Sequence, residues 1–209
     1  MSIQKLYMDY INKYGERSGL FELIKNKFQV KSALYPGSAL HLTPSFYFPV
    51  TVYIDTYSKA KPFFNKKDLL DFVVKNKRYD DPPIIRFYPV DYKKKVDEKD
   101  KDFDLLISQY AGFVSKYCKR YLKIGGILLV NNSHGDASMT SIDEEYNFFA
   151  VINLRNQKYY YSEKNLEQYF IPKKEMLITE DLLEKRQRGI GYKKTASLYL
   201  FKRIKSLSN

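Results

Sequence analysis

Five short, almost wholly apolar segments, separated by stretches with helical periodicity, are the feature that most constrains the fold of this chain. The segments are residues 32–35, 50–54, 84–88, 103–107 and 127–130. Most are rich in β-branched and aromatic side chains, which favour strands. Strands covered on both faces appear as continuous apolar runs rather than as alternating patterns. The alternation therefore predicts a three-layer α/β fold around a mostly parallel sheet.

Two amphipathic helices are predicted ahead of the first strand, at residues 3–14 and 18–27. In the first, apolar side chains recur at intervals of three and four residues. Ser2 is placed to cap this helix, and Gly15 to end it. Residues 1–30 are therefore expected to form a helical cover on the sheet.

Two further helix boundaries are predicted within the core. Asn65, with Asp68 three residues later, resembles a capping box before an apolar helix. A helix through residues 114–121 is expected to end at Gly125 and Gly126, just before the fifth strand. Cys118 falls on the apolar face of this second helix, where we expect a core position.

The C-terminal part of the chain predicts an antiparallel edge. Residues 148–154 and 158–161 are expected to pair as a hairpin, and residues 195–201 to form a last strand. Between them, residues 162–170 have a helical pattern. Residues 180–191 are basic and polar, which is typical of a mobile insert.

The composition bounds the class of protein. With 209 residues, 44% of them hydrophobic, the chain is long enough for one domain over 1–209 with its own core. The net charge of +12 favours attraction to nucleic acid, but 28 of the 36 basic residues are Lys and only 8 are Arg. Arg is the side chain preferred for bidentate phosphate recognition, so a Lys-rich solvated surface is the competing interpretation.

Several classes of function are excluded or disfavoured. One cysteine and two histidines cannot form a zinc cluster of the usual spacing, and no metal site is expected. No apolar run is long enough to span a bilayer, and the N-terminus lacks the pattern of a signal peptide. We therefore expect a cytoplasmic protein that has no membrane partner.

The residues that follow the strands are the candidates for ligand binding. In parallel sheets ligands bind beyond the carboxyl ends of the strands. After the first strand comes a tight polar loop around Gly37, and the second strand ends at Asp55, 18 residues later. A carboxylate at this spacing is placed to accept hydrogen bonds from ribose hydroxyls. The loop holds one glycine rather than three, which disfavours a dinucleotide.

Several of these segments resemble the class I S-adenosylmethionine-dependent methyltransferases. Residues 103–108 read FDLLIS, like the fourth strand of that family, and residues 121–130 read YLKIGGILLV, like its LKPGG-LLV segment. Residues 35–38, YPGS, stand where the family has its glycine-rich first motif, with proline and serine in place of glycines. The resemblance covers residues 31–154 and implies a Rossmann-like fold, with residues 155–209 forming the C-terminal hairpin, basic insert and last strand.

The resemblance implies S-adenosylmethionine as cofactor and assigns residues to it. Asp55 would hold the ribose, and Asp91 would lie beside the adenine. The full set of implied cofactor-binding residues is Tyr35, Pro36, Gly37, Ser38, Asp55, Thr56, Asp91, Ser108 and Gln109. His41 follows in the same first loop.

The methyl acceptor is not identified by the sequence, but three residues are candidates for the transfer site. Tyr110 follows the fourth strand and is a candidate substrate contact or aromatic lid. His134 is a candidate general base oriented by Asp136, and the competing interpretation of that loop is a turn with local hydrogen bonds. Residues 108–112 read SQYAG, which lacks the motif of enzymes that methylate base amino groups. Two alternatives stay open: a methyltransferase-like binding module without catalysis, and a basic nucleic-acid-binding protein.

Overall fold

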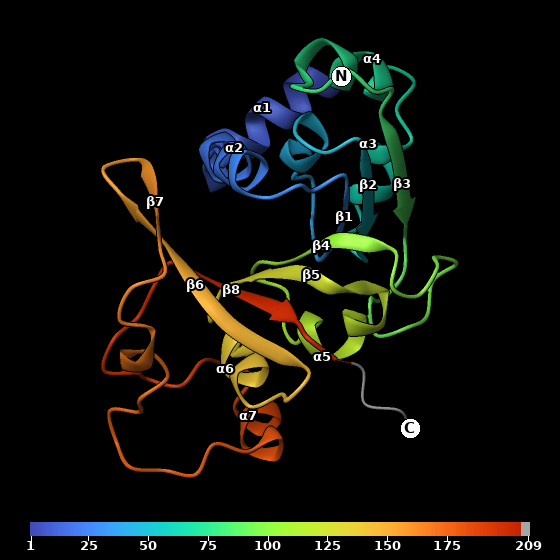
Figure 1. Ribbon diagram of the computed structural model, residues 1–209. Coiled ribbons are helices and arrows are strands. Elements are labelled where there is room, and N and C mark those ends of the chain that lie inside the picture. Colours follow the sequence, from blue (N-terminus) through green and yellow to red (C-terminus); the bar gives the residue numbers. More distant parts are fainter. Residues whose placement is uncertain (206–209) are drawn as a thin grey trace. The chain divides into compact units, whose positions relative to one another are not determined.

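The computed structural model describes residues 1–205 (Figure 1). The chain divides into two compact units, Met1–Asp97 and Glu98–Asn209, which are considered in turn. The prediction of a single domain over 1–209 stays a prediction. The last four residues of the predicted C-terminal section, 206–209, lie outside the described residues.

The first unit is built on three parallel strands in the order β3-β2-β1. In their register Ser32 is opposite Val50, and Val50 is opposite Ile84. Parallel neighbours need crossover connections, and helices and a 3-10 turn supply them here. The elements are α1 (Ile3–Tyr14), α2 (Ser18–Lys27), β1 (Ser32–Pro36), η1 (Thr43–Phe46), β2 (Val50–Ile54), α3 (Ala60–Phe64), α4 (Leu69–Asn76) and β3 (Ile84–Tyr88).

Both N-terminal helices have the predicted bounds and lie beside each other at one side of the three strands (Figure 1). The Ser2 hydroxyl accepts a hydrogen bond from the Lys5 N–H at 3.3 Å, and Gly15 ends α1 with a φ of 89°. Tyr7 is buried and packs against Phe46 and Phe72. The predicted helical cover is therefore confirmed.

The second unit contains one parallel pair and an antiparallel extension. Strand β5 pairs with β4 in parallel and with β8 in antiparallel fashion; β6 pairs with both β8 and β7 in antiparallel fashion. The elements are β4 (Phe103–Ser108), α5 (Val114–Cys118), η2 (Lys119–Tyr121), β5 (Leu122–Val130), α6 (Asp136–Ser141), β6 (Tyr146–Arg155), β7 (Lys158–Ser162), η3 (Leu166–Gln168), α7 (Glu180–Arg186) and β8 (Leu198–Arg203). The α/β class, the parallel strands and the antiparallel C-terminal hairpin are thus confirmed.

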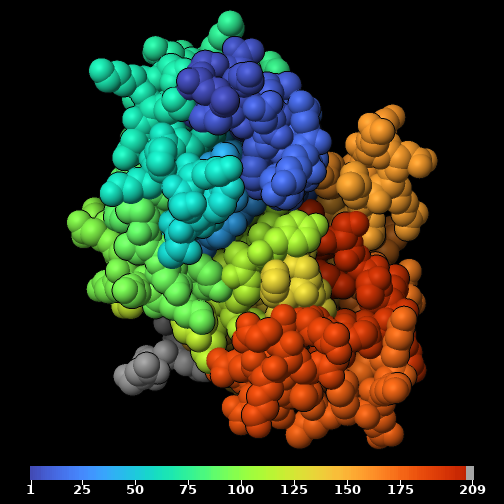
Figure 2. Space-filling view, turned by 180° about the vertical axis from the view of Figure 1, so that it is seen from behind, coloured from blue at the N-terminus to red at the C-terminus, as the bar shows by residue number. Residues whose placement is uncertain are grey.

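Helices α5, α6 and α7 lie on one side of this second sheet (Figure 1). Beneath α7 a cluster of buried side chains joins the three helices to the segment that follows α7. The cluster consists of Phe113, Met139, Leu183, Ile190 and Tyr192. In the space-filling view the yellow atoms of α6 adjoin the orange-red atoms of residues 180–200 (Figure 2). Cys118 is fully buried in α5, as predicted.

Two predicted helix boundaries are wrong. Asn65 caps the C-terminal end of α3 rather than beginning a helix, and the Asp68 carboxylate accepts the Ile3 N–H at 2.9 Å, at the start of α1. Gly125 and Gly126 lie inside β5 rather than at a helix end. The register between β4 and β5 shifts here and Gly125 has a φ of 84°, so the glycines form a bulge.

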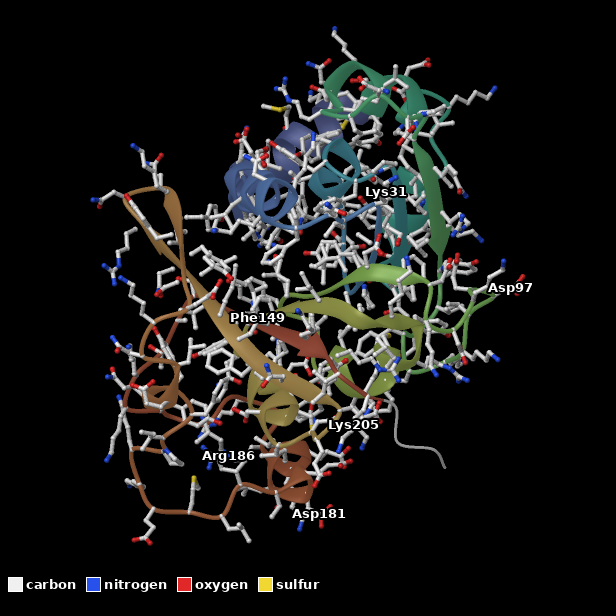
Figure 3. The ribbon with its side chains drawn as sticks, in the orientation of Figure 1. Lys31, Asp97, Phe149, Asp181, Arg186 and Lys205 are labelled. Atoms are coloured by element: carbon white, nitrogen blue, oxygen red, sulfur yellow. The ribbon has the colours of Figure 1, made fainter. Side chains whose placement is uncertain are left out.

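Two C-terminal predictions are also wrong. Residues 162–170 hold only the short turn η3, flanked by Asn165 and Phe170 in left-handed conformations that a helix does not tolerate. Residues 180–191 are not a mobile insert, because α7 is capped by Thr179 and buries Leu183 completely. Acidic and basic side chains at its two ends, among them Asp181 and Arg186 (Figure 3), complement the helix dipole.

The β6–β7 hairpin gives a prediction about stability. Its two-residue turn is Asn156–Gln157, and both residues have positive φ angles, 48° and 62°. Glycine adopts this conformation without steric cost. We expect Gln157→Gly to raise the free energy of unfolding by about 0.5 kcal/mol, measured by urea denaturation.

The matched control is Lys158→Gly, one residue further on, at the first position of β7. At this strand position glycine relieves no steric strain, so its added backbone freedom in the unfolded chain should lower the free energy of unfolding by about 0.5–1 kcal/mol. Equal effects of the two substitutions would contradict the turn geometry.

Candidate functional site

In the first unit the loop after β1 makes a tight turn back on itself. Gly37 has a φ of 68°, and its N–H donates to the Ile54 carbonyl at 2.8 Å. The His41 N–H donates to the Ser38 carbonyl at 2.9 Å, and Ala39 is left-handed with a φ of 48°. The loop therefore has a defined shape, which glycine permits at its first position.

Asp55, directly after β2, holds this loop in place. Its Oδ2 accepts the Ala39 N–H at 2.6 Å, and its Oδ1 accepts the Tyr57 N–H at 2.7 Å. The structure thus brings Asp55 to the loop around Gly37, as the spacing predicts. Asp55 is half-buried, and a carboxylate has about four acceptor positions, so it keeps capacity for further donors.

Two buried polar atoms on the same loop have no hydrogen-bond partner within residues 1–205, namely Ser38 Oγ and His41 Nε2. The His41 ring lies among Tyr10, Phe21 and Tyr35, and its Nδ1 is 3.2 Å from the Tyr35 hydroxyl. Burial lowers the pKa of His41 well below its usual range, and the positive charge of Arg17 lowers this pKa further. His41 is therefore a neutral imidazole at physiological pH.

The other predicted cofactor residues of this unit have more ordinary surroundings. Tyr35 and Pro36 are buried in β1, and Thr56 is exposed. Asp91 is exposed, and its Oδ1 accepts the Lys93 N–H at 2.9 Å within its own turn. The hydrogen bond from the Ala39 N–H to Asp55 therefore joins the loop after β1 to the end of β2.

In the second unit Asp136 is a buried structural carboxylate. Only 2% of its surface is exposed, and its oxygens accept hydrogen bonds from the Ser108 and Ser115 hydroxyls and from the Ser115 N–H. These bonds connect the end of β4, the start of α5 and the start of α6. Burial raises the pKa of Asp136 to about 6, although the hydrogen bonds from Ser108 and Ser115 act in the opposite direction.

The expected bond between His134 and Asp136 is not formed. His134 is exposed, and within the described part of the chain its imidazole makes no hydrogen bond. Asp136 is buried and already accepts three hydrogen bonds from Ser108 and Ser115, whereas His134 is exposed, so the carboxylate does not orient the imidazole. The catalytic role of His134 stays a prediction.

Tyr110 lines an open hollow in the second unit. Tyr110 is 64% exposed, with a left-handed φ of 59°, and Gln109 beside it is buried. The hollow has a volume of about 490 Å³, and segments after β4, after β5 and before β8 contribute its walls. Its lining consists of Tyr110, Asn131, Asn132, Ser133, Arg188, Gly189, Ile190, Gly191, Thr195, Ala196, Ser197 and Tyr199.

Sequence reasoning missed most of this lining. Asn131 is buried, and its Nδ2 has no partner among the described residues; Arg188 stands on a segment that the sequence predicts to be mobile. A signal was present in Gly189, because a glycine within a basic stretch permits a close approach of the backbone. A Cβ at Gly189 would lie only 2.2 Å from the Asn132 carbonyl oxygen.

Proteins similar to this chain are found among solved structures. No family model matches the chain, and no curated protein does. Among solved structures, the chain is similar to a Methanococcus maripaludis protein assigned as an S-adenosyl-L-methionine-dependent methyltransferase, with 14% identity over 96% of this chain and 92% of that chain and a TM-score of 0.48.

Two further solved structures are similar over about 70% of the chain. A methyltransferase from Geobacter sulfurreducens has 14% identity, covering 72% of this chain and 82% of its own, with a TM-score of 0.48. The O-methyltransferase TomG from Streptomyces achromogenes, in complex with SAM, has 11% identity, covering 69% and 76%, with a TM-score of 0.44.

Residues 1–205 contain no group of three or more His, Cys, Asp or Glu side chains placed to hold a metal ion. No helix in this part of the chain combines the length and the apolar character needed to cross a bilayer.

Asp136 gives a prediction about pH. Its pKa is raised to about 6 in the folded protein, while the unfolded chain loses the proton near 3.8. The folded state therefore binds the proton more tightly, and this contribution to stability is present at pH 4 and is lost as the pH rises through 6. At about 1.4 kcal/mol per pKa unit the loss is on the order of 2–3 kcal/mol.

The measurement is urea unfolding at pH 4, 5, 6 and 7, for the wild type and for Asp136→Asn. The uncharged amide can still accept the Ser115 N–H, so the variant should fold and should lack this pH dependence. The difference in unfolding free energy between the two proteins should shift in favour of Asp136→Asn as the pH rises. A difference that is constant with pH would show that folding does not raise the pKa of Asp136.

Proposed function

We propose that the chain is an S-adenosylmethionine-dependent methyltransferase whose ribose site is Asp55. The observation that carries the proposal is the position of this carboxylate. It is half-buried at the carboxyl end of β2, bonded to the Ala39 N–H of the loop after β1, and able to accept further hydrogen bonds. Ligands of parallel sheets bind at this end of the strands.

The residues of the loop after β1 fit such a cofactor in two respects. The Ser38 hydroxyl is buried and lacks a partner within the described residues, although buried polar groups are normally hydrogen-bonded. Gly37 and Ala39 both have positive φ angles, which curve the loop at the end of the strand. We propose that the Ser38 hydroxyl bonds a polar group of the cofactor, next to the ribose on Asp55.

The other implied residues keep narrower roles in this proposal. The Ser108 hydroxyl is committed to Asp136, which leaves its backbone for ligand contacts. Tyr35 and Pro36 shape the loop from within β1. Thr56, Asp91 and Gln109 remain proposed contacts of the cofactor.

The cofactor supplies an electrophilic methyl group on a sulfonium. Transfer is then an in-line displacement, for which the protein's main contribution is to hold donor and acceptor in line. A base is needed only if the acceptor atom has to lose a proton. His134, which is exposed after β5, is the proposed base in that case, and Tyr110 the proposed contact with the acceptor. A cytoplasmic location is part of the same proposal.

The test is calorimetric titration with S-adenosylhomocysteine. We expect the wild type to bind, and Asp55→Asn to bind roughly 10–100-fold more weakly, because hydrogen bonds to a charged group contribute about 1.5–3 kcal/mol. The control is Asp71→Asn, which removes the same charge from an exposed position on α4 and should bind like the wild type.

The alternative functions predict different results. A folded wild type that does not bind at millimolar S-adenosylhomocysteine would contradict the methyltransferase proposal and favour a binding module. Equal loss of affinity in the Asp55 and Asp71 variants would show a general charge effect rather than a ribose site. Tight, steeply salt-dependent binding of nucleic acid without cofactor binding would favour the basic nucleic-acid-binding protein.

A further inference from the structure

The lining of the hollow in the second unit offers hydrogen-bond donors and a positive charge. Among the described residues it contains one charged side chain, Arg188, and neither Asp nor Glu. Its volume of about 490 Å³ lies within the usual range of small-molecule sites. The charge and the size together favour a small ligand that carries a negative charge.

Asn131 supplies a buried donor with a fixed orientation. Its Oδ1 accepts the Ser133 N–H at 3.3 Å, the Ser133 hydroxyl at 2.9 Å and the Tyr110 N–H at 3.4 Å. Because two of these donors are backbone N–H groups, the oxygen is assigned to that side and the Nδ2 to the other. Asn131 is 7% exposed, and its Nδ2 has no partner in residues 1–205. A buried donor without an acceptor is costly unless a ligand satisfies it.

Arg188 supplies the positive charge from a constrained backbone. Its guanidinium makes neither an ion pair nor a hydrogen bond with the described residues. The next residue, Gly189, is pressed so closely against Asn132 that a Cβ would collide with it. On the other side the Arg188 carbonyl oxygen lies 3.1 Å from the Cβ position of Gly135. The segment that bears Arg188 is therefore held against the loop after β5.

The remaining walls are apolar or aromatic. Ile190 and Tyr199 are almost fully buried, and Tyr110 is exposed. The Tyr199 hydroxyl accepts the Ala196 N–H at 3.1 Å, and burial raises the pKa of Tyr199, so the phenol stays neutral. Flat apolar surfaces next to a cation and an amide donor suit a planar ligand with a carboxylate at one end.

We propose that this hollow binds the methyl acceptor, and that the acceptor is a small planar molecule bearing a carboxylate. Arg188 and the Nδ2 of Asn131 bind the carboxylate, while Tyr110, Ile190 and Tyr199 contact the apolar body. The identification of this ligand as the acceptor rests on the proposed function. The binding of a carboxylate does not.

The test uses a matched pair of probes, 3-fluorobenzoate and 3-fluorobenzamide, followed by fluorine NMR. The two differ in charge but hardly in shape. We expect low-millimolar binding of the acid, as befits a ligand of this size, and binding of the amide at least about tenfold weaker. Equal affinity for the two, or no binding of either at 20 mM, would overturn the proposal.

Two variants locate the charge that makes the difference. Arg188→Gln should reduce the preference for the acid to less than about twofold. Lys185→Gln removes one positive charge from an exposed position on α7 outside the hollow, and should keep the full preference. Thermal unfolding of both variants at the wild-type temperature verifies that they are folded. A preference that survives in Arg188→Gln would contradict the assignment.

A parallel titration with S-adenosylhomocysteine separates this proposal from the proposed function. Arg188→Gln should bind S-adenosylhomocysteine like the wild type, and Asp55→Asn should bind 3-fluorobenzoate like the wild type. If the wild type binds the acid but not S-adenosylhomocysteine, the methyltransferase proposal fails and the carboxylate site stands. If the wild type binds S-adenosylhomocysteine but not the acid, only the proposed carboxylate site is contradicted.

Discussion

Both units depend on an aspartate that accepts hydrogen bonds where the parallel strands end. In the first unit Asp55 follows β2 and accepts the Ala39 N–H of the loop after β1. In the second unit Asp136 joins Ser108, at the end of β4, to Ser115, near the start of α5. The two differ in exposure: Asp55 is half-buried and keeps acceptor capacity, whereas Asp136 is buried and fully engaged. That difference makes Asp55 a candidate ligand-binding group and Asp136 a structural one.

The sequence predicts the elements whose signal is local. Continuous apolar runs gave the five strands of the parallel arrangement, and helical periodicity gave α1 and α2 with their bounds. Prediction from the sequence fails where tertiary packing decides the local structure. Glycines commonly end helices, but Gly125 and Gly126 form a bulge in β5. Residues 180–191 are polar in composition, yet Leu183 and Ile190 are enough to seat α7 and the segment after it in the core.

In the candidate site, too, local sequence signals predict some features and tertiary packing decides the others. The spacing of Gly37 and Asp55 predicts their neighbourhood, because two consecutive parallel strands end at the same edge. The partners of Asp136 could not be predicted, since Ser108 and Ser115 are 28 and 21 residues away in sequence. The position of Arg188 could not be predicted for a similar reason. Arg188 and Asn131 line the same hollow because β8 pairs with both β5 and β6, out of chain order. With only 8 arginines among 36 basic residues, an arginine that lines a hollow and makes no ion pair within residues 1–205 is more informative than the net charge.

The proposed methyltransferase function depends most on Asp55 as a ligand of the ribose. A crystal structure of the protein grown with S-adenosylhomocysteine tests this directly. We expect the ribose hydroxyls within hydrogen-bond distance of the Asp55 carboxylate and the Ser38 hydroxyl within reach of the ligand, with the Ala39 N–H still bonded to Asp55. A ligand bound away from the carboxyl ends of β1 and β2, or a protein that stays ligand-free at millimolar S-adenosylhomocysteine, would contradict the account.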